Sequence, residues 1–249
     1  LSGPKTHIVN MLSNTSIIGL STIERGLAAH VFSGKEGVEV GEAMAQFHGL
    51  RQSTREAFRN AALTWKTGQT GFGVNKIEGP RARSISSGAF NIDPDSWFGW
   101  GVDALGAAVN VPGKALQTSD EWFKTIGYRF ELNALAFRQS ARIGGNDAAK
   151  KSNMADVLAT PPETLKLGAA SEAAYRTFTS TPSETTRAFL HWRNNTKLGR
   201  SIGKYVAPFV NTPANIFKFA LERTPLAPIT AAYQSAIAKG GPEAAMARS

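Results

Sequence analysis

Glycine and proline interrupt this sequence at short intervals, and this punctuation limits the folds that the chain can adopt. The 249 residues include 24 glycines and 12 prolines, spread over many separate positions. Because glycine and proline end helices or form turns, the stretches between them favour many short and medium helices over one compact bundle. No alternating pattern is long enough to indicate a sheet. We therefore expect an all-α chain: an extended array of helices of low compactness, with a Gly/Pro-rich irregular middle segment.

The sequence divides into three regions: an N-terminal helical pair over residues 1–68, an irregular Gly/Pro-rich connector over 69–116, and a C-terminal helical region over 117–249. The first helix, from about Thr6 to Phe32, has apolar residues on more than one face, so we expect it to be buried or to lie in an interface. An amphipathic helix follows over 36–66. The connector holds several aromatic residues, which indicates that part of it packs onto something.

The clearest helix start lies in the third region. Thr118, with Glu121 three residues later, forms a capping-box pattern, and the apolar stripe that follows predicts a helix ending at Gly144–Gly145. Before it we expect only a short helix over 102–116, interrupted at Pro112–Gly113. Residues 146–167 are polar and mixed. Further helices are predicted over 171–179, 183–193, 197–205, 214–223 and 228–238.

Charge and residue types exclude several classes of function. The 28 Lys and Arg residues outnumber the 19 Asp and Glu residues by nine, so nucleic acid, anionic lipid or an acidic protein are the partners to consider. The absence of cysteine excludes disulfides, thiolate catalysis and cysteine–zinc sites. The four histidines lack metal-site spacing, and Gly71–Phe72–Gly73 lacks the strand and lysine of a nucleotide-binding loop. No uninterrupted apolar run approaches the roughly 18–20 residues that span a bilayer. We expect no catalytic residue, no metal, no cofactor and no enzymatic activity.

Two clusters are candidates for binding. The first combines cationic and aromatic side chains, which phosphate binding and base stacking require: Arg187, Trp192, Arg193, Lys197, Arg200 and Lys204. The pattern favours an alternative, in which the aromatic residues form the core and the basic residues solvate the outer face. The second cluster belongs to the helix that follows the start signal Asn211–Thr212–Pro213. We expect it to dock on a partner through Phe209, Ile216, Phe217, Phe219 and Leu221.

Three stretches resemble a region of very large phage-encoded polyvalent proteins. Residues 1–10 (LSGPKTHIVN), followed by an apolar helix, are similar to the opening of that region. Residues 118–123 (TSDEWF) and 128–138 look like its central helix. Residues 208–217 (PFVNTPANIF) and 221–225 (LERTP) resemble an element near its far end. Each motif is moderately specific, and the shared order and spacing extend the resemblance over nearly the whole chain.

In that family the region lies in internal virion or ejection proteins of tailed phages, sometimes beside a cell-wall-cleaving transglycosylase or a virion RNA polymerase. The resemblance therefore implies a structural segment in the virion interior, which contacts portal, core or sister copies as a homo-oligomer and enters the host envelope or cytoplasm with the genome. It carries over no catalytic residues. Because the chain begins with Leu1, we expect it to have been cut from a longer polypeptide.

Two other functions are alternatives: a DNA-binding module that uses residues 187–204, and a membrane-associating segment of an ejection channel that inserts residues 6–32. The leading hypothesis depends on one expectation, namely that other polypeptide covers the apolar stripes of these helices. A deep cleft lined with converging carboxylates or histidines would contradict it.

Overall fold

The structure, a computed structural model, describes residues 4–32, 37–68, 86–182, 184–196 and 211–248. Within these ranges the regular elements are α-helices and short 3-10 helices, and none of the described residues forms a strand. The expected all-α class is therefore confirmed. The first helices are α1 (Pro4–Phe32) and α2 (Glu42–Thr67), followed by the 3-10 turn η1 (Ser87–Phe90).

The longest element is α3 (Trp97–Ile143), a continuous helix of 47 residues and about 70 Å. Ser96 caps its start, because its side chain accepts a hydrogen bond of 3.0 Å from the Gly99 amide. The interruption expected at Pro112–Gly113 and the helix start expected at Thr118 are therefore wrong. The suggested boundary between residues 116 and 117 also falls inside this helix. Thr118 is not a cap, and its buried hydroxyl has no hydrogen-bond partner among the described residues.

The helix passes through Pro112 for a physical reason. Proline inside a helix removes one backbone hydrogen bond and costs about 3 kcal/mol, but the turns on both sides keep theirs. The loss of one hydrogen bond therefore does not end the helix. The later turns pack onto neighbouring helices, where Ile126, Phe130 and Leu132 are almost completely buried.

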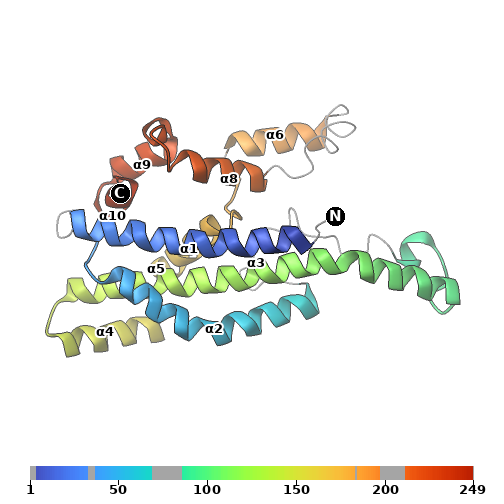
Figure 1. Cartoon of the computed structure of the whole chain (residues 1–249), viewed down its shortest axis with the longest axis horizontal. Helices are drawn as coiled ribbons and strands as arrows, with labels where there is room; N and C mark the ends of the chain where they lie inside the picture. The colour runs from blue at the N-terminus through green and yellow to red at the C-terminus, as the bar shows by residue number, and fades with distance from the viewer. Residues whose placement is uncertain (1–3, 33–36, 69–85, 183, 197–210, 249) are drawn as a thin grey trace.

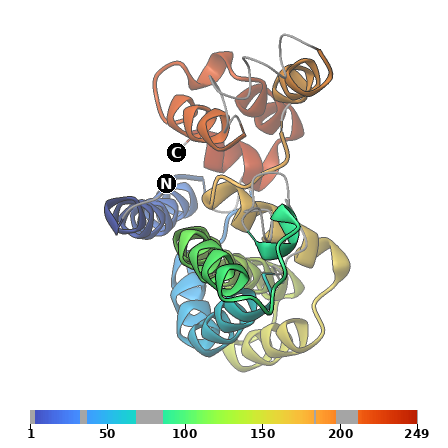
Figure 2. The same cartoon turned by 90° about the vertical axis from the view of Figure 1, so that its right-hand side faces the viewer.

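A ridge of small residues packs α2 closely against α3. The ridge repeats every four residues and consists of Ala45, Gly49, Ser53, Ala57 and Ala61, all buried. At Gly49 a Cβ atom would lie 2.6 Å from the Asn133 amide nitrogen and 2.8 Å from the Arg129 carbonyl oxygen. Only glycine allows the two backbones to come this close. Figure 2 shows α2 and α3 side by side, seen from one end.

Two shorter helices complete the body: α4 (Asp147–Ala159) and α5 (Glu163–Arg176), both packed against α3. The polar segment over 146–167 is therefore largely helical, and the helix expected over 171–179 starts earlier. Asn146 begins α4 by accepting a hydrogen bond of 2.9 Å from the Ala149 amide, since asparagine is a favoured residue at the N-cap position. Pro161–Pro162 separates the two helices.

The remaining helices lie over this body (Figure 1). They are α6 (Glu184–Asn195), α8 (Asn211–Leu221), the turn η3 (Ala227–Ile229), α9 (Ala231–Lys239) and α10 (Gly241–Arg248). Helix α6 agrees closely with the helix expected over 183–193, while α8 and α9 lie within a few residues of those expected over 214–223 and 228–238. The helix expected over 197–205 lies outside the described residues. A small apolar cluster joins α10 to α1 through Ala28, Ala29, Val38 and Ala245.

Helix α1 lies along the edge of the body, between α3 and the layer formed by α8 to α10 (Figures 1 and 2). None of the helices in the described ranges is long and apolar enough to cross a membrane.

Candidate interaction surface

The distribution of residues on α1 is inverted relative to an ordinary surface helix. A helix on a protein surface normally turns its aliphatic residues inward. On α1 the buried side holds Asn14, Ser21, Thr22 and Arg25 beside a few small or apolar residues. Eight of its large apolar residues point to solvent, with exposed fractions between 40% and 64%, whereas Ile17 is buried. We call these eight residues the free face of α1: Ile8, Val9, Met11, Leu12, Leu20, Ile23, Leu27 and Val31.

The buried hydroxyls of α1 are satisfied within the helix, because Ser21 and Thr22 both donate to the Ile18 carbonyl oxygen at 2.9 Å. The charge of Arg25 is satisfied across the helices. Its guanidinium group donates to Glu42 of α2 at 2.8 Å and to both carboxylate oxygens of Glu131 of α3 at 2.7 Å.

Arg25 belongs to a larger set of charged side chains that we call the ionic network: Arg25, Glu42, Glu131, Arg138, Glu172 and Arg176. Arg138 binds Glu42 with two hydrogen bonds of 2.6 and 2.7 Å, and Arg176 of α5 binds Glu131 at 2.9 Å and Glu172 at 3.1 Å. Glu42 and Glu131 are almost completely buried. The network therefore joins α1, α2, α3 and α5 at one point.

Electrostatics keep these buried groups charged. Burial alone would raise the pKa of Glu131, but the guanidinium groups of Arg25 and Arg176 outweigh burial and lower that pKa below 4.5. Burial would likewise lower the pKa of Arg25, and Glu131 and Glu42 raise it instead. Charge and polar contacts thus supply much of the attachment of the inner side of α1, together with the apolar cluster around Ala28 and Ala29, while the eight residues of the free face stay exposed.

A second charged contact joins α1 to the upper layer. Arg223, just beyond α8, donates to the two carboxylate oxygens of Glu24 at 2.7 and 2.9 Å, and its guanidinium lies 3.6 Å from the centre of the Phe219 ring. Tyr175 donates a hydrogen bond to Glu222 and accepts one of 3.1 Å from Arg223. Burial and the bond to Glu222 raise the pKa of Tyr175 well above its usual range.

Between α1, α5 and the upper layer lies an open cleft of about 1110 Å³. Leu20, Ile23 and Leu27 of the free face line one side of it. Five carboxylates also line it: Glu24, Glu131, Glu172, Glu222 and Glu243. A cleft lined with converging carboxylates is the feature that would contradict the hypothesis of an interaction module. Each of the five, however, has an Arg or Lys partner within 4.0 Å.

The predicted nucleic-acid cluster is only partly described. Arg187 is exposed on α6, Trp192 is 41% exposed and lies beside Phe189 with 5.5 Å between ring centres, and Arg193 is half-buried. Lys197, Arg200 and Lys204 lie outside the described residues. Among the described residues of this cluster, Arg187 is thus an exposed cation on the same helix as a ring pair that is partly open to solvent.

The predicted docking residues of α8 separate into two groups. Ile216 and Phe217 are exposed, by 46% and 69%. Phe219 turns inward, with its ring centre 5.6 Å from that of Tyr175 and 5.4 Å from that of Phe178. Leu221 is half-buried, and Phe209 lies outside the described residues. Phe219 is thus a packing residue of this chain, while Ile216 and Phe217 are free to contact a partner.

The amphipathic helix expected over 36–66 is α2, and its small residues, not its large ones, face the body. The small-residue ridge is buried, and a set of large side chains faces solvent instead: Met44, Phe47, Phe58, Leu63 and Trp65. The four-residue spacing of alanine, glycine and serine was the signal that could have revealed this. At the far end of α3, Trp97 and Trp100 are also exposed, by 85% and 73%, and Figure 1 shows this end projecting beyond the body.

Comparisons with known proteins add no relative to this picture: no protein-family model, no curated protein and no solved structure matches the chain. In the described part of the chain, no group of three or more His, Asp or Glu side chains is arranged to hold a metal ion.

Proposed function

We propose that this chain is a structural and interaction segment of a phage internal virion (ejection) protein, packaged in the particle and delivered with the genome. We propose further that its copies associate through the free face of α1. The resemblance of the three sequence motifs supports the phage assignment. The exposed free face of α1 supports the proposed association of copies, because eight exposed aliphatic residues on one helix are unfavourable in water unless something covers them.

The spacing of the free face fits a second copy of the same helix. Two α1 helices that pair antiparallel, with a two-fold axis between Gly19 and Leu20, place complementary residues at the same height: Ile8 opposite Val31, Leu12 opposite Leu27, Ser16 opposite Ile23, and Gly19 opposite Leu20. A two-fold interface needs such a self-complementary surface. Gly19 is exposed, and nothing lies within 4 Å of the position its Cβ would take, so it leaves room for the partner's Leu20.

The size and charge of this face suit a dimer. Helix α1 has 29 residues, so it is about 43 Å long and about 10 Å across, and half of that cylinder is on the order of 700 Å². Stable interfaces bury roughly 800 Å² on each partner. The free face contains no charged residue. Two charged residues beside its second half, Glu24 and Arg25, are already paired with Arg223 and with the ionic network.

Analytical ultracentrifugation of the full chain tests the association. We expect the wild type to form a dimer at micromolar concentrations, and the double variant Leu12→Asn/Leu27→Asn to be a monomer with unchanged helix content, because both side chains are at least half exposed. Leu167→Asn is the matched control. Leu167 is 63% exposed on α5, and its variant should dimerise like the wild type. A monomeric wild type, or a double variant that still dimerises, would contradict the proposal.

Cysteine cross-linking tests the register, since the chain has no cysteine of its own. A mixture of the Leu12→Cys and Leu27→Cys proteins should oxidise to a covalent heterodimer, whereas each protein alone should not. Cross-linking of Leu12→Cys with itself would indicate parallel helices and overturn the antiparallel arrangement. Flotation of the wild type with liposomes, lost in the Leu12→Asn/Leu27→Asn variant, would show that lipid covers this face instead of a second copy.

The virion role needs a separate experiment. Mass spectrometry of purified particles of the encoding phage should detect this chain, and Phe217→Ser should lower its copy number if α8 docks on a neighbouring virion protein. Phe217 is the suitable position because Phe219 packs inside the chain. Absence of the chain from particles would overturn the virion assignment, but it would not contradict the proposed α1 dimer.

A further inference from the structure

The charged residues of α2 differ in whether they are paired. Both acidic residues have cationic partners: the buried Glu42 binds Arg25 and Arg138 in the ionic network, and Glu56, about one-third exposed, binds Arg129 of α3 at 2.6 Å. The basic residues Arg51, Arg55, Arg59 and Lys66 are exposed. The charges of α2 that lack an ion-pair partner among the described residues are therefore all positive.

Three of these cations form a regular row. Arg51, Arg55 and Arg59 follow one another at intervals of four residues, which places them on one side of the helix and about 6 Å apart along its axis. No described residue forms an ion pair with any of the three, although ten ion pairs occur elsewhere in the described chain. Like charges at this spacing repel each other, so an external polyanion would stabilise the row.

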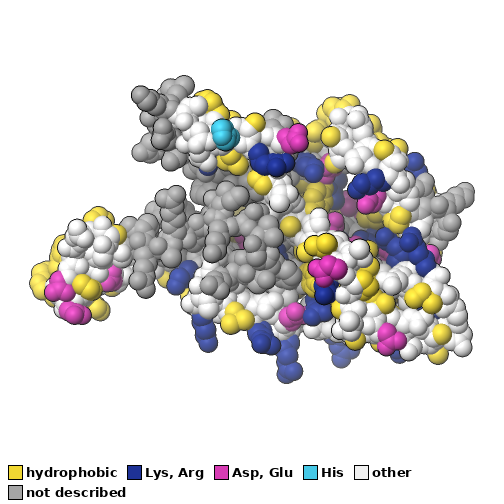
Figure 3. Space-filling view, turned by 180° about the vertical axis from the view of Figure 1, so that it is seen from behind, with side chains coloured by type: hydrophobic (Ala, Val, Ile, Leu, Met, Phe, Trp, Pro, Cys, Tyr) yellow, Lys and Arg dark blue, Asp and Glu magenta, His cyan; other side chains and the backbone are white. Residues whose placement is uncertain are grey.

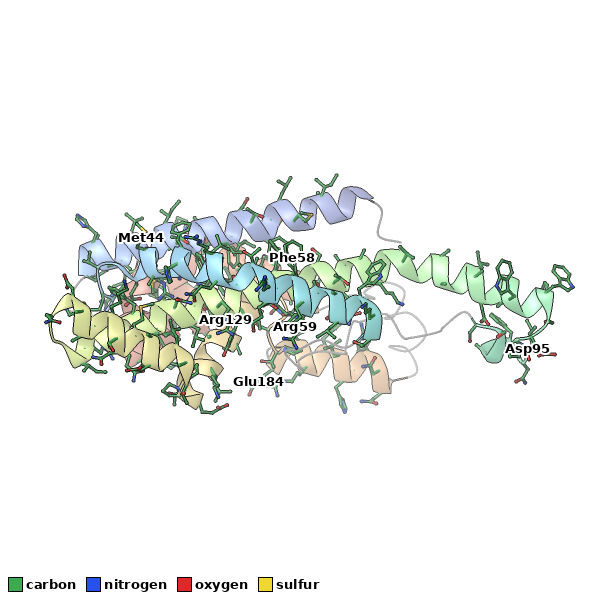
Figure 4. The ribbon with its side chains drawn as sticks, turned by 90° about the horizontal axis from the view of Figure 1, so that it is seen from below. Met44, Phe58, Arg59, Asp95, Arg129 and Glu184 are labelled. Atoms are coloured by element: carbon green, nitrogen blue, oxygen red, sulfur yellow. The ribbon has the colours of Figure 1, made fainter. Side chains whose placement is uncertain are left out.

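Aromatic rings lie beside the arginines. Phe47, Phe58 and Trp65 are exposed by 50%, 62% and 42%. Two of the rings are held by edge-to-face contacts with α3, Phe47 with Phe130 at 5.9 Å and Phe58 with Trp122 at 6.2 Å between centres. Figure 4 looks onto α2 from below and labels Phe58 and Arg59 on it. These rings are thus partly fixed before any ligand arrives, which lowers the entropy lost on binding.

We propose that the outer face of α2 binds single-stranded nucleic acid. The arginine row would contact successive phosphates, and the fixed rings would stack on unpaired bases. Sequence-independent binding of single strands combines these two elements, a basic track for the backbone and aromatic platforms for the bases. The bases of a duplex are already stacked and offer no face to the rings. Lys and Arg side chains project from the lower edge of the molecule in Figure 3, the edge at which α2 and α4 lie.

The experiment measures fluorescence anisotropy of a labelled oligothymidine of about 20 nucleotides with the full chain, at several salt concentrations. For single strands, the logarithm of the binding constant falls with the logarithm of salt with a slope of about −0.7 per phosphate contact. The variant Arg51→Gln/Arg55→Gln/Arg59→Gln should therefore have a slope shallower by about 2. At low salt it should bind at least about tenfold more weakly.

Two controls separate this face from general charge and from stacking. The variant Lys150→Gln/Lys151→Gln/Arg187→Gln removes the same charge elsewhere, including the exposed cation of α6, and should keep the wild-type slope. Phe58→Leu keeps an apolar contact with Trp122 but removes the ring, so it should weaken binding of the oligothymidine without changing the slope. Circular dichroism confirms that each variant remains folded.

Three results would overturn the proposal. The first is a wild type that does not bind the oligothymidine, or an arginine variant that binds it as tightly as the wild type does. The second is equal affinity for a duplex of the same number of phosphates, which would exclude stacking. The third is binding to vesicles of anionic lipid that the oligothymidine cannot displace, which would identify α2 as a membrane contact.

Discussion

Glu131 lies in the C-terminal half of α3 between arginines from α1 and α5, and its side chain is 6% exposed. A buried carboxylate is tolerated only when cations and hydrogen bonds replace the water it has lost. Here Arg25, Arg176 and, at 3.5 Å, the Gln46 amide supply them. Single polar side chains thus decide how the helices of this chain meet.

Replacing this carboxylate tests its role. We expect Glu131→Gln to lower the free energy of unfolding by about 3–5 kcal/mol, because it leaves buried arginines without their counter-charge. Chemical denaturation at neutral pH measures the change. Glu56→Gln is the control: its pair with Arg129 is about one-third exposed, so it should cost less than about 1 kcal/mol. Equal effects of the two variants would contradict the network's importance.

The same group makes stability depend on pH. The folded-state pKa of Glu131 lies below 4.5, so its contribution is fully present above that value and is lost as the pH falls through the folded-state pKa. Wild-type stability should therefore fall as the pH drops below 4.5, and Glu131→Gln should show a smaller fall over the same range. Denaturation curves at a series of acidic pH values measure both. Parallel curves for the two proteins would mean that other carboxylates cause the loss.

At the scale of elements, α3 combines two unlike halves in one helix. From Glu121 to Ser140 most of its residues are buried between α2, α4 and α5, whereas residues 97–111 are largely exposed. Contacts of the exposed half with other described elements are few, chiefly the hydrogen bonds from Ser87 of η1 to Asp103 at 2.7 and 2.8 Å. Pro112 lies between the halves and removes one backbone hydrogen bond.

This difference should appear in amide exchange. We expect the amides of residues 98–111 to exchange at least tenfold faster than those of residues 123–140, because local opening of the first set breaks few tertiary contacts. Hydrogen–deuterium exchange with peptide-level mass spectrometry measures both sets in one sample. Pro112→Ala should slow exchange in the first set by restoring the missing hydrogen bond. Uniform protection along α3 would show that the exposed half is stabilised by something beyond its described contacts.

The whole molecule consists of a packed body and an upper layer with fewer attachments. The described contacts that hold α8 to the body are the pair of Arg223 with Glu24, the ring packing of Phe219, and hydrogen bonds from Asn215 to the carbonyl oxygens of Phe178 and Ser180 at 2.9 and 3.2 Å. The upper layer thus depends on a few polar contacts, one aromatic cluster and the small apolar cluster that joins α10 to α1.

Such an arrangement favours stepwise unfolding. In dilute denaturant, amides of α8 to α10 should become exchangeable before those of α2, α3 and α5. Arg223→Gln should lower the opening free energy of the upper layer and leave that of α2 unchanged. Exchange measured at increasing denaturant concentrations separates these units. A single cooperative loss of protection throughout the chain would contradict a layered molecule. Stepwise loss of packing would also suit a protein that must cross a narrow channel, as the proposed ejection role requires.

The sequence by itself determined the helical class and most helix positions. Apolar periodicity and the glycine and proline breaks act over a few residues, so they can be read from the local chain. The cap at Asn146 and the small-residue ridge of α2 are equally local patterns, although neither was used in the sequence-based predictions. The resemblance to phage internal virion proteins also came from the sequence, and it stays a prediction.

Tertiary structure alone decided which side of α1 is buried and where α3 begins. Arg25 faces inward because it pairs with Glu131 of α3, which is 106 residues away along the chain. A local sequence pattern cannot reveal a partner at that distance. Thr118 and Pro112 gave strong local signals, but burial of the later turns of α3 against three other helices outweighed them. The free face of α1 and the arginine row of α2 follow from the same cause: once long-range ion pairs fixed the inner sides, the apolar and the cationic residues that remained had to face outward.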